Sequence, residues 1–240
     1  MIEIDITLWF TLGTLGMALG SIGLAYGFVV LPREWYRTYA DVVIVTLIAT
    51  VAYGLMALGI GALDASAGTA VFIPRYVDWL LTTPLHVLFI AVIAGASRRV
   101  IGAAVGLQAA TIVFGFIGAL LATPLKEIFF LAGSLAFVGV VYLLVVEASD
   151  SAEDLSVVQA GLYRKLRNFV IVLWLVYPII WVLAPTGYGL MDAETSSLVI
   201  TYIDVVAKVG FGLIALNGLR ALQSTDVDPE TFVHPLAVSE

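Results

Sequence analysis

The sequence predicts an all-α membrane protein built as a bundle of seven transmembrane helices. Of its 240 residues, 61% are apolar and only 12% are charged, whereas soluble domains carry about 25% charged residues. Mean hydropathy is +1.06. The apolar residues form runs that are each long enough to cross a hydrocarbon core of about 30 Å. There are seven such runs, at about residues 6–30, 39–63, 71–94, 100–121, 125–146, 166–183 and 198–216, the sixth reaching back towards Val157.

The basic residues predict how this bundle sits in the membrane. They gather after the first, third, fifth and seventh runs, all on one side, whereas the connections of the other side carry only Lys126. By the positive-inside rule, the N-terminus is extracellular and the C-terminus cytoplasmic, as in a multi-pass protein of the cell membrane. The basic residues of the cytoplasmic side are Arg33, Arg37, Arg98, Arg99, Arg164, Lys165, Arg167 and Arg220.

The segments outside the runs add little further structure. Residues 63–72 have a turn-forming centre flanked by β-formers, which predicts a short hairpin over the extracellular mouth. Residues 1–222 form the helical domain, and residues 223–240 are expected to be an acidic, disordered cytoplasmic tail. The first five residues are acidic where a signal peptide is basic, so no cleaved leader is expected.

Composition also excludes several kinds of site. The chain has no cysteine, which rules out disulfides and thiol chemistry, and its two histidines argue against a histidine-rich metal site. A net charge of −7 argues against nucleic-acid binding. The informative polar residues are therefore those inside the apolar runs.

Four ionisable residues lie well inside these runs: Arg75, Asp78, Asp204 and Lys208. Charges at membrane depth are costly, so they mark function or pair with each other. Asp204 and Lys208 are one helical turn apart, on the same face. A desolvated lysine can condense with an aldehyde, and the protonated Schiff base then needs counter-ions, which Asp78 and Asp204 supply. A structural ion-pair cluster that locks the helices together accounts for the same four charges.

Aromatic residues favour a ligand site over a purely structural cluster. Trp174, Tyr177 and Trp181 recur at i, i+3 and i+7 on one helix face. Such a stripe is often ordinary core, but opposite a lone buried lysine it predicts the wall of a slot for a long, flat apolar ligand. Pro84 and Pro178 lie within spanning runs and are expected to kink the helices around this slot.

These residues together resemble the microbial (type I) rhodopsins. The resemblance rests on the strings at residues 75–84, 174–181 and 204–208, and it extends from the first helix to the last. It implies that retinal is bound to Lys208 as a protonated Schiff base, that Asp78 is the primary counter-ion and proton acceptor, and that Asp204 is the second counter-ion.

The resemblance also implies the surroundings of the retinal. Arg75 and Tyr177 would belong to a hydrogen-bonded cluster around Asp204, which Tyr53 would complete. Trp79, Trp174 and Trp181 would sandwich the polyene. The other implied cofactor-binding residues are Thr82 and Thr83 in the pocket wall, His86, Thr111, and Gly115, Phe130, Gly133 and Phe137 at the ring end.

Departures from the light-driven proton pumps indicate the subtype. Phe89 stands where the pumps carry the carboxylic acid that returns a proton to the Schiff base. Thr186 and Ser196 stand where the pumps keep two outer glutamates, although Asp192 and Glu194 are close enough in sequence to substitute. Without an internal donor the photocycle should be slow, which suits a sensory rhodopsin that signals to a membrane transducer.

Two positions near Lys208 indicate different subtypes. Ala207 stands where type II sensory rhodopsins carry a threonine and matches the pumps, whereas Tyr202 resembles the tyrosine that meets the transducer. This mixture favours the middle rhodopsins, between pumps and type II sensors. His86 stands where relatives carry an aliphatic residue, and either it is hydrogen-bonded within the bundle or it tunes isomer choice or the proton path.

Three functions follow, of which the first is preferred. It is a retinal photoreceptor, not an enzyme, that moves a proton to Asp78 and signals through a transducer. The second is an outward proton pump, which Ala207 favours and Phe89 opposes. The third is a retinal-free transporter with Asp78 and Asp204 as a proton relay. The paired half-length repeats that are typical of transporters are not seen in this sequence, which argues against it. Whether the protein is a monomer or a homo-oligomer stays open.

Overall fold

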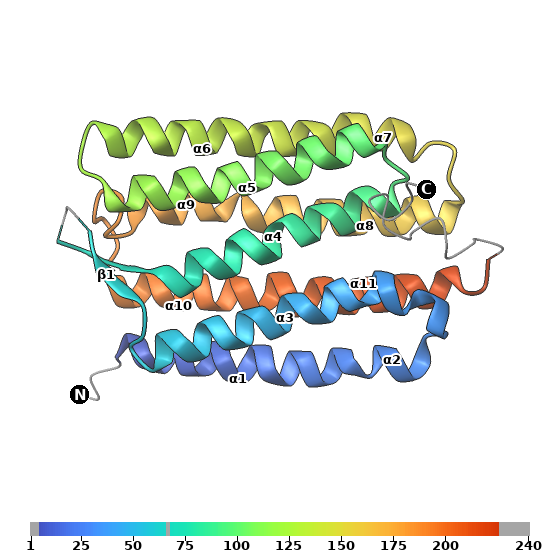
Figure 1. The fold of residues 1–240 in the computed structure, drawn as a ribbon, viewed down its shortest axis with the longest axis horizontal. Helices are drawn as coiled ribbons and strands as arrows, with labels where there is room; N and C mark the ends of the chain where they lie inside the picture. The colour runs from blue at the N-terminus through green and yellow to red at the C-terminus, as the bar shows by residue number, and fades with distance from the viewer. Residues whose placement is uncertain (1–4, 66–67, 226–240) are drawn as a thin grey trace, which may run out of the picture.

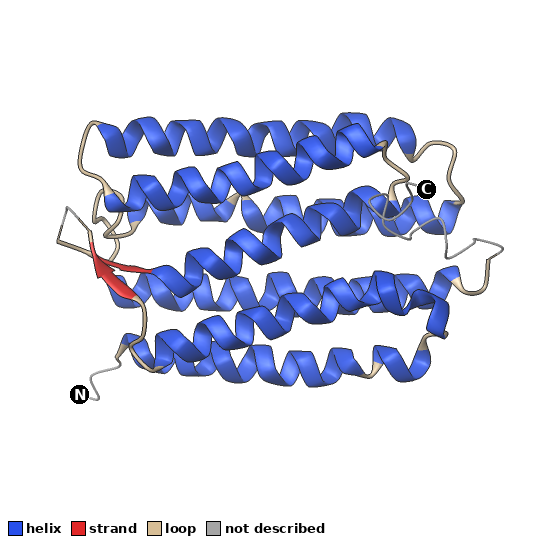
Figure 2. Cartoon of the chain, in the orientation of Figure 1, coloured by secondary structure: helices blue, strands red, loops and turns tan. Residues whose placement is uncertain are grey.

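The computed structural model describes residues 5–65 and 68–225. The chain is almost wholly helical, with one two-stranded hairpin (Figures 1 and 2). In chain order the elements are α1 (Ile6–Ala25), α2 (Gly27–Val30), η1 (Arg33–Trp35), α3 (Tyr36–Ala57), β1 (Ala62–Asp64), β2 (Ala70–Phe72), α4 (Ile73–Ile93), α5 (Arg98–Leu120), α6 (Leu125–Tyr142), η2 (Leu143–Glu147), α7 (Ala148–Ser151), α8 (Val157–Trp174), α9 (Val176–Leu183), α10 (Ala193–Val205), η3 (Val206–Gly210) and α11 (Phe211–Leu222).

These elements make seven membrane-length helices, which confirms the predicted fold class. Neighbouring spans pack side by side, and the last closes the bundle because α10 packs on α1 (Figure 1). The third and seventh spans are the most enclosed, with 61% and 50% of their apolar windows buried, against 17–44% for the others. The four charges at membrane depth all lie on these two central spans.

The two helices beside the hairpin have different boundaries from those predicted. The second apolar run was expected to continue to Leu63, but α3 ends at Ala57. Gly59 and Gly61 have φ values of +72° and +84°, a left-handed backbone that ends the helix. The hairpin then pairs Ala62 with Phe72, so the predicted hairpin is confirmed. α4 begins at Ile73, two residues later than expected, and Pro74 lies in its first turn, where its missing N–H costs nothing.

Side-chain caps extend the last two spans. Ser156 accepts a hydrogen bond from the backbone N–H of Gln159 at 3.2 Å, so α8 begins at Val157 as the sequence suggested. Asp192 caps α10 in the same way, and the seventh span runs from 193 to 222, beyond the predicted 198–216. Polar residues at both ends of this helix lie outside the apolar run, so hydropathy alone predicted a shorter span.

The helices are interrupted where their backbone bonding changes. The α8–α9 break lies at Leu175, close to Pro178, which cannot donate to the carbonyl of Trp174. Pro84, by contrast, lies inside α4 without interrupting it. The seventh span contains the π-helical turn η3, and Lys208 is its central residue. π-Turns insert an extra residue and re-aim the side chains of a helix.

The basic loops lie together at one end of the bundle. The end of α2, the start of α5, the start of α8 and the end of α11 are all there, opposite the hairpin (Figure 1). The predicted tail falls mostly on residues 226–240, which lie outside the described residues, as do the first four residues.

Candidate functional site

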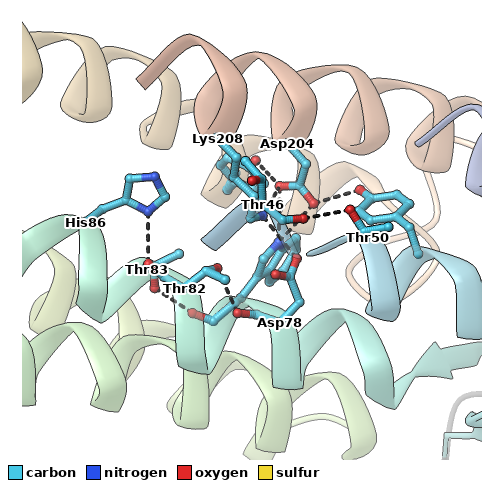
Figure 3. A network of polar contacts seen from close by, with 11 residues as sticks. Thr46, Thr50, Asp78, Thr82, Thr83, His86, Asp204 and Lys208 are labelled. Atoms are coloured by element: carbon cyan, nitrogen blue, oxygen red, sulfur yellow. Dashed lines mark hydrogen bonds and ion pairs between the residues drawn. The ribbon is translucent and has the colours of Figure 1, made fainter. Parts of the chain in front are cut away.

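The centre of the bundle holds one amine between two carboxylates. Lys208 Nζ lies 3.0 Å from Asp78 Oδ2 and 3.6 Å from Asp204 Oδ1 (Figure 3). The three side chains are 3%, 0% and 1% exposed. Because η3 places Lys208 one turn after Asp204 and opposite α4, the amine reaches both acids. Charges this deeply buried require such pairing.

Asp204 is held by donors from several helices. Tyr53 Oη of α3 donates to Oδ2 at 2.7 Å, and Trp79 Nε1 of α4 lies 3.1 Å from both carboxylate oxygens. Tyr177 Oη of α9 donates to Oδ1. The resemblance implied the two tyrosines as partners of Asp204, but Trp79 was expected only against the polyene. Asp204 is thus fixed as an acceptor, since hydrogen bonds to a charged oxygen are the strong ones.

Asp78 has a different environment. Apart from the charge contact with Lys208, neither carboxylate oxygen has a hydrogen bond of good geometry among the described residues. Thr82, one turn on, donates its hydroxyl to the Asp78 main-chain carbonyl at 2.7 Å. Asp78 therefore keeps free lone pairs beside the amine, as a proton acceptor must. Asp204, by contrast, has its acceptor capacity largely filled.

Arg75 lies beside this cluster. The resemblance implies that it is hydrogen-bonded around Asp204, which stays a prediction, and its buried Nε and Nη2 have no partner among the described residues. Its guanidinium carbon lies 5.4 and 5.5 Å from the ring centroids of Phe10 and Phe72, in cation–π contact. The Phe10 and Phe72 rings of α1 and β2 hold the guanidinium towards the hairpin and out of the carboxylate cluster.

A cavity of about 420 Å³ opens beside Lys208. This volume lies within the range of small-molecule sites, about 300–1,000 Å³. Lys208 is the only lysine in its lining, and the rest is mostly aromatic, aliphatic and glycine. An enclosed amine at an apolar cavity fits retinal, whose aldehyde meets the amine and whose polyene meets the rings. A purely structural ion pair would leave this cavity unexplained.

Most of the predicted cofactor-binding residues meet at this cavity. Thr82 and Tyr53 do not: Thr82 turns its hydroxyl back to its own helix, and Tyr53 reaches the site only through Asp204. The predicted residues in the lining are Arg75, Trp79, Thr83, His86, Thr111, Gly115, Phe130, Gly133, Phe137, Trp174, Tyr177, Trp181, Asp204 and Lys208.

The aromatic walls have distinct geometries. Trp181 stacks on Phe130, with ring centroids 4.5 Å apart and planes at 19°. Trp79 meets Tyr177 edge to face at 5.3 Å. These two contacts join α4, α6 and α9 around the cavity, so its shape is set by rings that hold each other in place.

Several functional candidates in the structure were missed in the sequence. Gln108 of α5 lines the cavity and donates to Thr83 Oγ1 at 2.9 Å, while its own carbonyl oxygen has no partner within residues 5–65 and 68–225. Thr201 Oγ1 is also buried and has no partner in the same part of the chain. An amide inside the apolar run 100–121 was a signal for Gln108, since polar groups in spanning helices usually face the bundle interior. A threonine gives no comparable signal.

The structure also shows where the positions that distinguish the subtypes lie. Thr186, Ser196 and Ala207 line the cavity. Phe89 is 2% exposed and packs on Phe211 at 5.6 Å. Tyr202 is 69% exposed on α10 and points away from the site.

The chain matches known proteins over almost its whole length. Residues 5–222 match the family model described as bacteriorhodopsin-like protein. The chain is 52% identical to sensory rhodopsin-2 of Haloarcula vallismortis, covering 98% of both chains. It is 38% identical to sensory rhodopsin-2 of Natronomonas pharaonis, covering 92% of both.

A solved structure agrees with these sequence matches. The thermophilic rhodopsin from Rubrobacter xylanophilus superimposes with a TM-score of 0.87 at 31% identity, covering 91% of this chain and 97% of that one. The likeness extends from the first span to the last and includes the span that carries Lys208. The protein is therefore a member of the bacteriorhodopsin-like family.

Proposed function

We propose that the protein is a retinal-binding photoreceptor of the sensory rhodopsin type, with Lys208 as the attachment site. The observation that carries this proposal is the position of Lys208 Nζ between Asp78 and Asp204, at the wall of an apolar cavity. The sensory rhodopsin-2 relatives support the photoreceptor class over the pump.

Retinal, bound as a Schiff base on Lys208, supplies the absorption of light and the isomerisation that starts the cycle. The protein residues divide the remaining work. Asp78 Oδ2, 3.0 Å from Nζ and without hydrogen bonds, receives the proton from Nζ. Asp204 keeps its charge because Tyr53, Trp79 and Tyr177 donate to it. Loss of the Asp78–Lys208 charge pair then loosens α4 from the seventh span.

Slow recovery is the property that makes the protein a sensor. On the side of Lys208 away from Asp78, Phe89 takes the place of an acid and lies in a closely packed apolar layer. The basic loops bound that layer, which supports a cytoplasmic position for this end and an extracellular one for the hairpin. Proton return across such a layer is slow, so the activated state lasts long enough for a partner to detect it.

The partner proposed for this signal is a membrane-embedded transducer. Tyr202 is 69% exposed on the lipid-facing side of α10, two residues before Asp204 in sequence. A helix of a partner packed against Tyr202 would therefore sense movements at the counter-ion directly. Replacing Tyr202 by Ala should leave the pigment unchanged and weaken transducer binding, measured by co-purification of the two proteins.

The first experiment tests attachment of the chromophore. The chain expressed with retinal should absorb visible light, and Lys208→Ala should abolish that absorbance. Lys165→Ala, a change at an exposed lysine, is the matched control and should keep it. A wild-type protein that stays colourless would overturn the photoreceptor and leave a retinal-free transporter.

The second experiment separates sensor from pump. The pump is the alternative because Ala207 matches the pumps and Asp78 is intact. Vesicles containing the protein are illuminated and the external pH is followed with and without a protonophore. A sensor should give at most a small, transient pH change, whereas a sustained change that the protonophore abolishes would establish pumping.

A further inference from the structure

His86 is the buried group in the cavity that the proposed function leaves without a role. It lies on α4 two turns beyond Asp78 (Figure 3), about 12 Å along the helix. Phe89 follows three residues later on the same helix. The side chain is 3% exposed and lines the cavity. It is one of two histidines in the sequence; the other, His234, lies outside the described residues.

The hydrogen bond of His86 fixes its tautomer. Nδ1 lies 2.9 Å from the main-chain oxygen of Thr82. A carbonyl oxygen can only accept, so Nδ1 carries the hydrogen, and Nε2 of the neutral ring is a bare lone pair. Nε2 is buried and has no partner among the described residues. The chain thus exposes a basic nitrogen to the cavity and supplies nothing to satisfy it.

The surroundings of His86 are otherwise unable to carry a proton. Its ring meets Phe211 edge to face at 4.3 Å and Trp174 at 6.1 Å. Beyond them lie Phe89 and the fully buried Ile90. This aromatic layer separates Lys208 from the end of the bundle that carries the basic loops.

The charged groups that share the cavity with His86 are Arg75 of α4 and Asp204 and Lys208 of the seventh span. On its own helix the nearest titratable residue towards the hairpin is Asp78, and α3 and α9 bring Tyr53 and Tyr177 to the same cluster. From α5, α8 and α11, Gln108, Trp174 and Phe211 face the cavity or the ring, and none of the three titrates. The other cavity-lining residues of α5 and α6 carry no charge: Thr111, Ile112, Gly115, Phe130, Gly133, Ser134 and Phe137.

We propose that His86 Nε2 is a proton relay at the inner side of this apolar layer, which carries a proton over the last part of its way to Lys208 Nζ. The proton still has to pass Phe89, which cannot carry it, so recovery stays slow; without His86 it must cross the whole layer unaided and recovery is slower still. A hydronium ion on the Phe89 side gives its proton to Nε2: an O–H bond breaks, neutral water is left, and the new N–H bond makes an imidazolium. The Nε2–H bond then breaks as the proton passes through water in the cavity that both residues line to Nζ, where the new N–H bond forms. His86 returns to its neutral form, with Nδ1–H still bonded to Thr82. The inference rests on the proposed function.

Kinetics of the pigment test the relay. In His86→Leu and His86→Gln, visible pigment should form but recovery of the dark state should slow at least about a hundredfold, the low end for loss of an acid–base group. The rate should also fall about tenfold per pH unit, because protons must then come directly from solution. Added imidazole should restore the rate of dark-state recovery in His86→Leu. His234→Gln is the matched control and should behave as wild type.

The glutamine variant separates proton transfer from packing. Its amide can still donate to the Thr82 carbonyl but cannot pass on a proton at neutral pH. If His86 were only a structural hydrogen-bonding residue, His86→Gln would recover at the wild-type rate with the wild-type pH dependence. That result would overturn the relay and leave the photoreceptor proposal intact.

A spectroscopic measurement needs no retinal. In ¹⁵N-histidine-labelled, retinal-free protein at neutral pH, the signal lost in His86→Gln should show a protonated Nδ1 and an unprotonated Nε2. A protonated Nε2 in that protein would overturn the inference. A colourless wild-type protein would contradict the proposed function instead, so the two failures are distinguishable.

Discussion

At the scale of single residues, the two acids beside Lys208 are chemically alike but differently supported. Asp204 receives hydrogen bonds from Tyr53, Trp79 and Tyr177, whereas Asp78 receives none of good geometry. Since donated hydrogen bonds stabilise the ionised form of a carboxyl, this asymmetry supports the proposed roles, with Asp78 as the proton acceptor and Asp204 as the second counter-ion.

Removal of one donor from Asp204 should destabilise the fold measurably. Tyr53 is fully buried, so Tyr53→Phe leaves a charged oxygen short of a partner inside the bundle. We expect a loss of about 1.5–3 kcal/mol in the free energy of unfolding, the value typical of a hydrogen bond to a charged group. Thermal unfolding followed by circular dichroism measures it. The control, Tyr202→Phe, removes an exposed hydroxyl and should change little; equal effects of the two variants would contradict the assignment.

The residues of the site differ in how visible they were in the sequence. Lys208, Asp78 and Asp204 could be picked out because charges are rare at membrane depth. The bond from Trp79 to Asp204 and the free guanidinium nitrogens of Arg75 could not, since both depend on how neighbouring helices place their side chains. Resemblance to a family implied the two tyrosines as partners of Asp204, but not the bond from Trp79.

At the scale of elements, glycines let α1 approach the seventh span closely. Gly13, Gly16 and Gly20 recur at about one-turn intervals and face Thr201, Val205 and Val209. Small residues at such spacing allow spanning helices to pack backbone to side chain. This contact closes the bundle and supports the helix that carries Lys208 and Asp204.

A methyl group on this face should disturb the site. A Cβ at Gly13 would lie 2.3 Å from Tyr53 Cδ1 and 2.9 Å from Thr201 Cγ2, so Tyr53 must move. We expect Gly13→Ala to destabilise the protein by about 1–3 kcal/mol, as overpacking does, and to shift the visible absorbance through Asp204. Gly23→Ala on the same helix is the control, because nothing lies within 4 Å of its Cβ. Identical thermal stability of the two variants would refute this packing.

The cap of the seventh span gives a pH-dependent prediction. The pKa of the exposed Asp192 carboxyl is lowered because the backbone N–H and the hydroxyl of Thr195 donate to it. A carboxyl whose pKa is lower in the folded than in the unfolded protein stabilises the fold at pH values above its unfolded-state pKa, which is about 3.9 for Asp. This stabilisation is lost as the pH falls through the folded-state pKa.

Replacement of Asp192 by Asn isolates this contribution, because the amide still caps the helix but does not titrate. The thermal midpoint of wild type should exceed that of Asp192→Asn at about pH 6, since an anion at a helix N-terminus is favourable. The difference should vanish by about pH 2. A difference that is constant with pH would exclude Asp192 as its source.

At the scale of the whole molecule, the site depends on closure of the bundle. The cavity-lining residues lie between Ile6 and Lys208 and come from every span except the second, whose Tyr53 reaches Asp204. A chain ending at Thr225 should therefore form the pigment with unchanged absorbance and thermal stability. A chain ending at Gly218 loses the fully buried Leu219 and Leu222 and should be less stable. Loss of colour on cutting at Thr225 would show that the tail contributes to the fold.

The sequence by itself determined the class of this protein and the identity of its central groups. Apolar runs of membrane length require helices, because backbone groups in lipid must be bonded within the segment. A lone lysine and two acids within such runs must meet at the protein interior, because lipid does not solvate charge. Those requirements hold whatever the details of packing.

Only the tertiary structure decided how these groups divide their work. Hydrogen-bond partners come from helices far apart in sequence, as Tyr53 and Asp204 do, and no local pattern encodes them. The same holds for the bare Nε2 of His86, which became visible only once Thr82 was seen to hold Nδ1 and the neighbouring rings were seen to offer no donor. Directional contacts within a few ångströms depend on the relative placement of whole helices, and that placement is settled by packing.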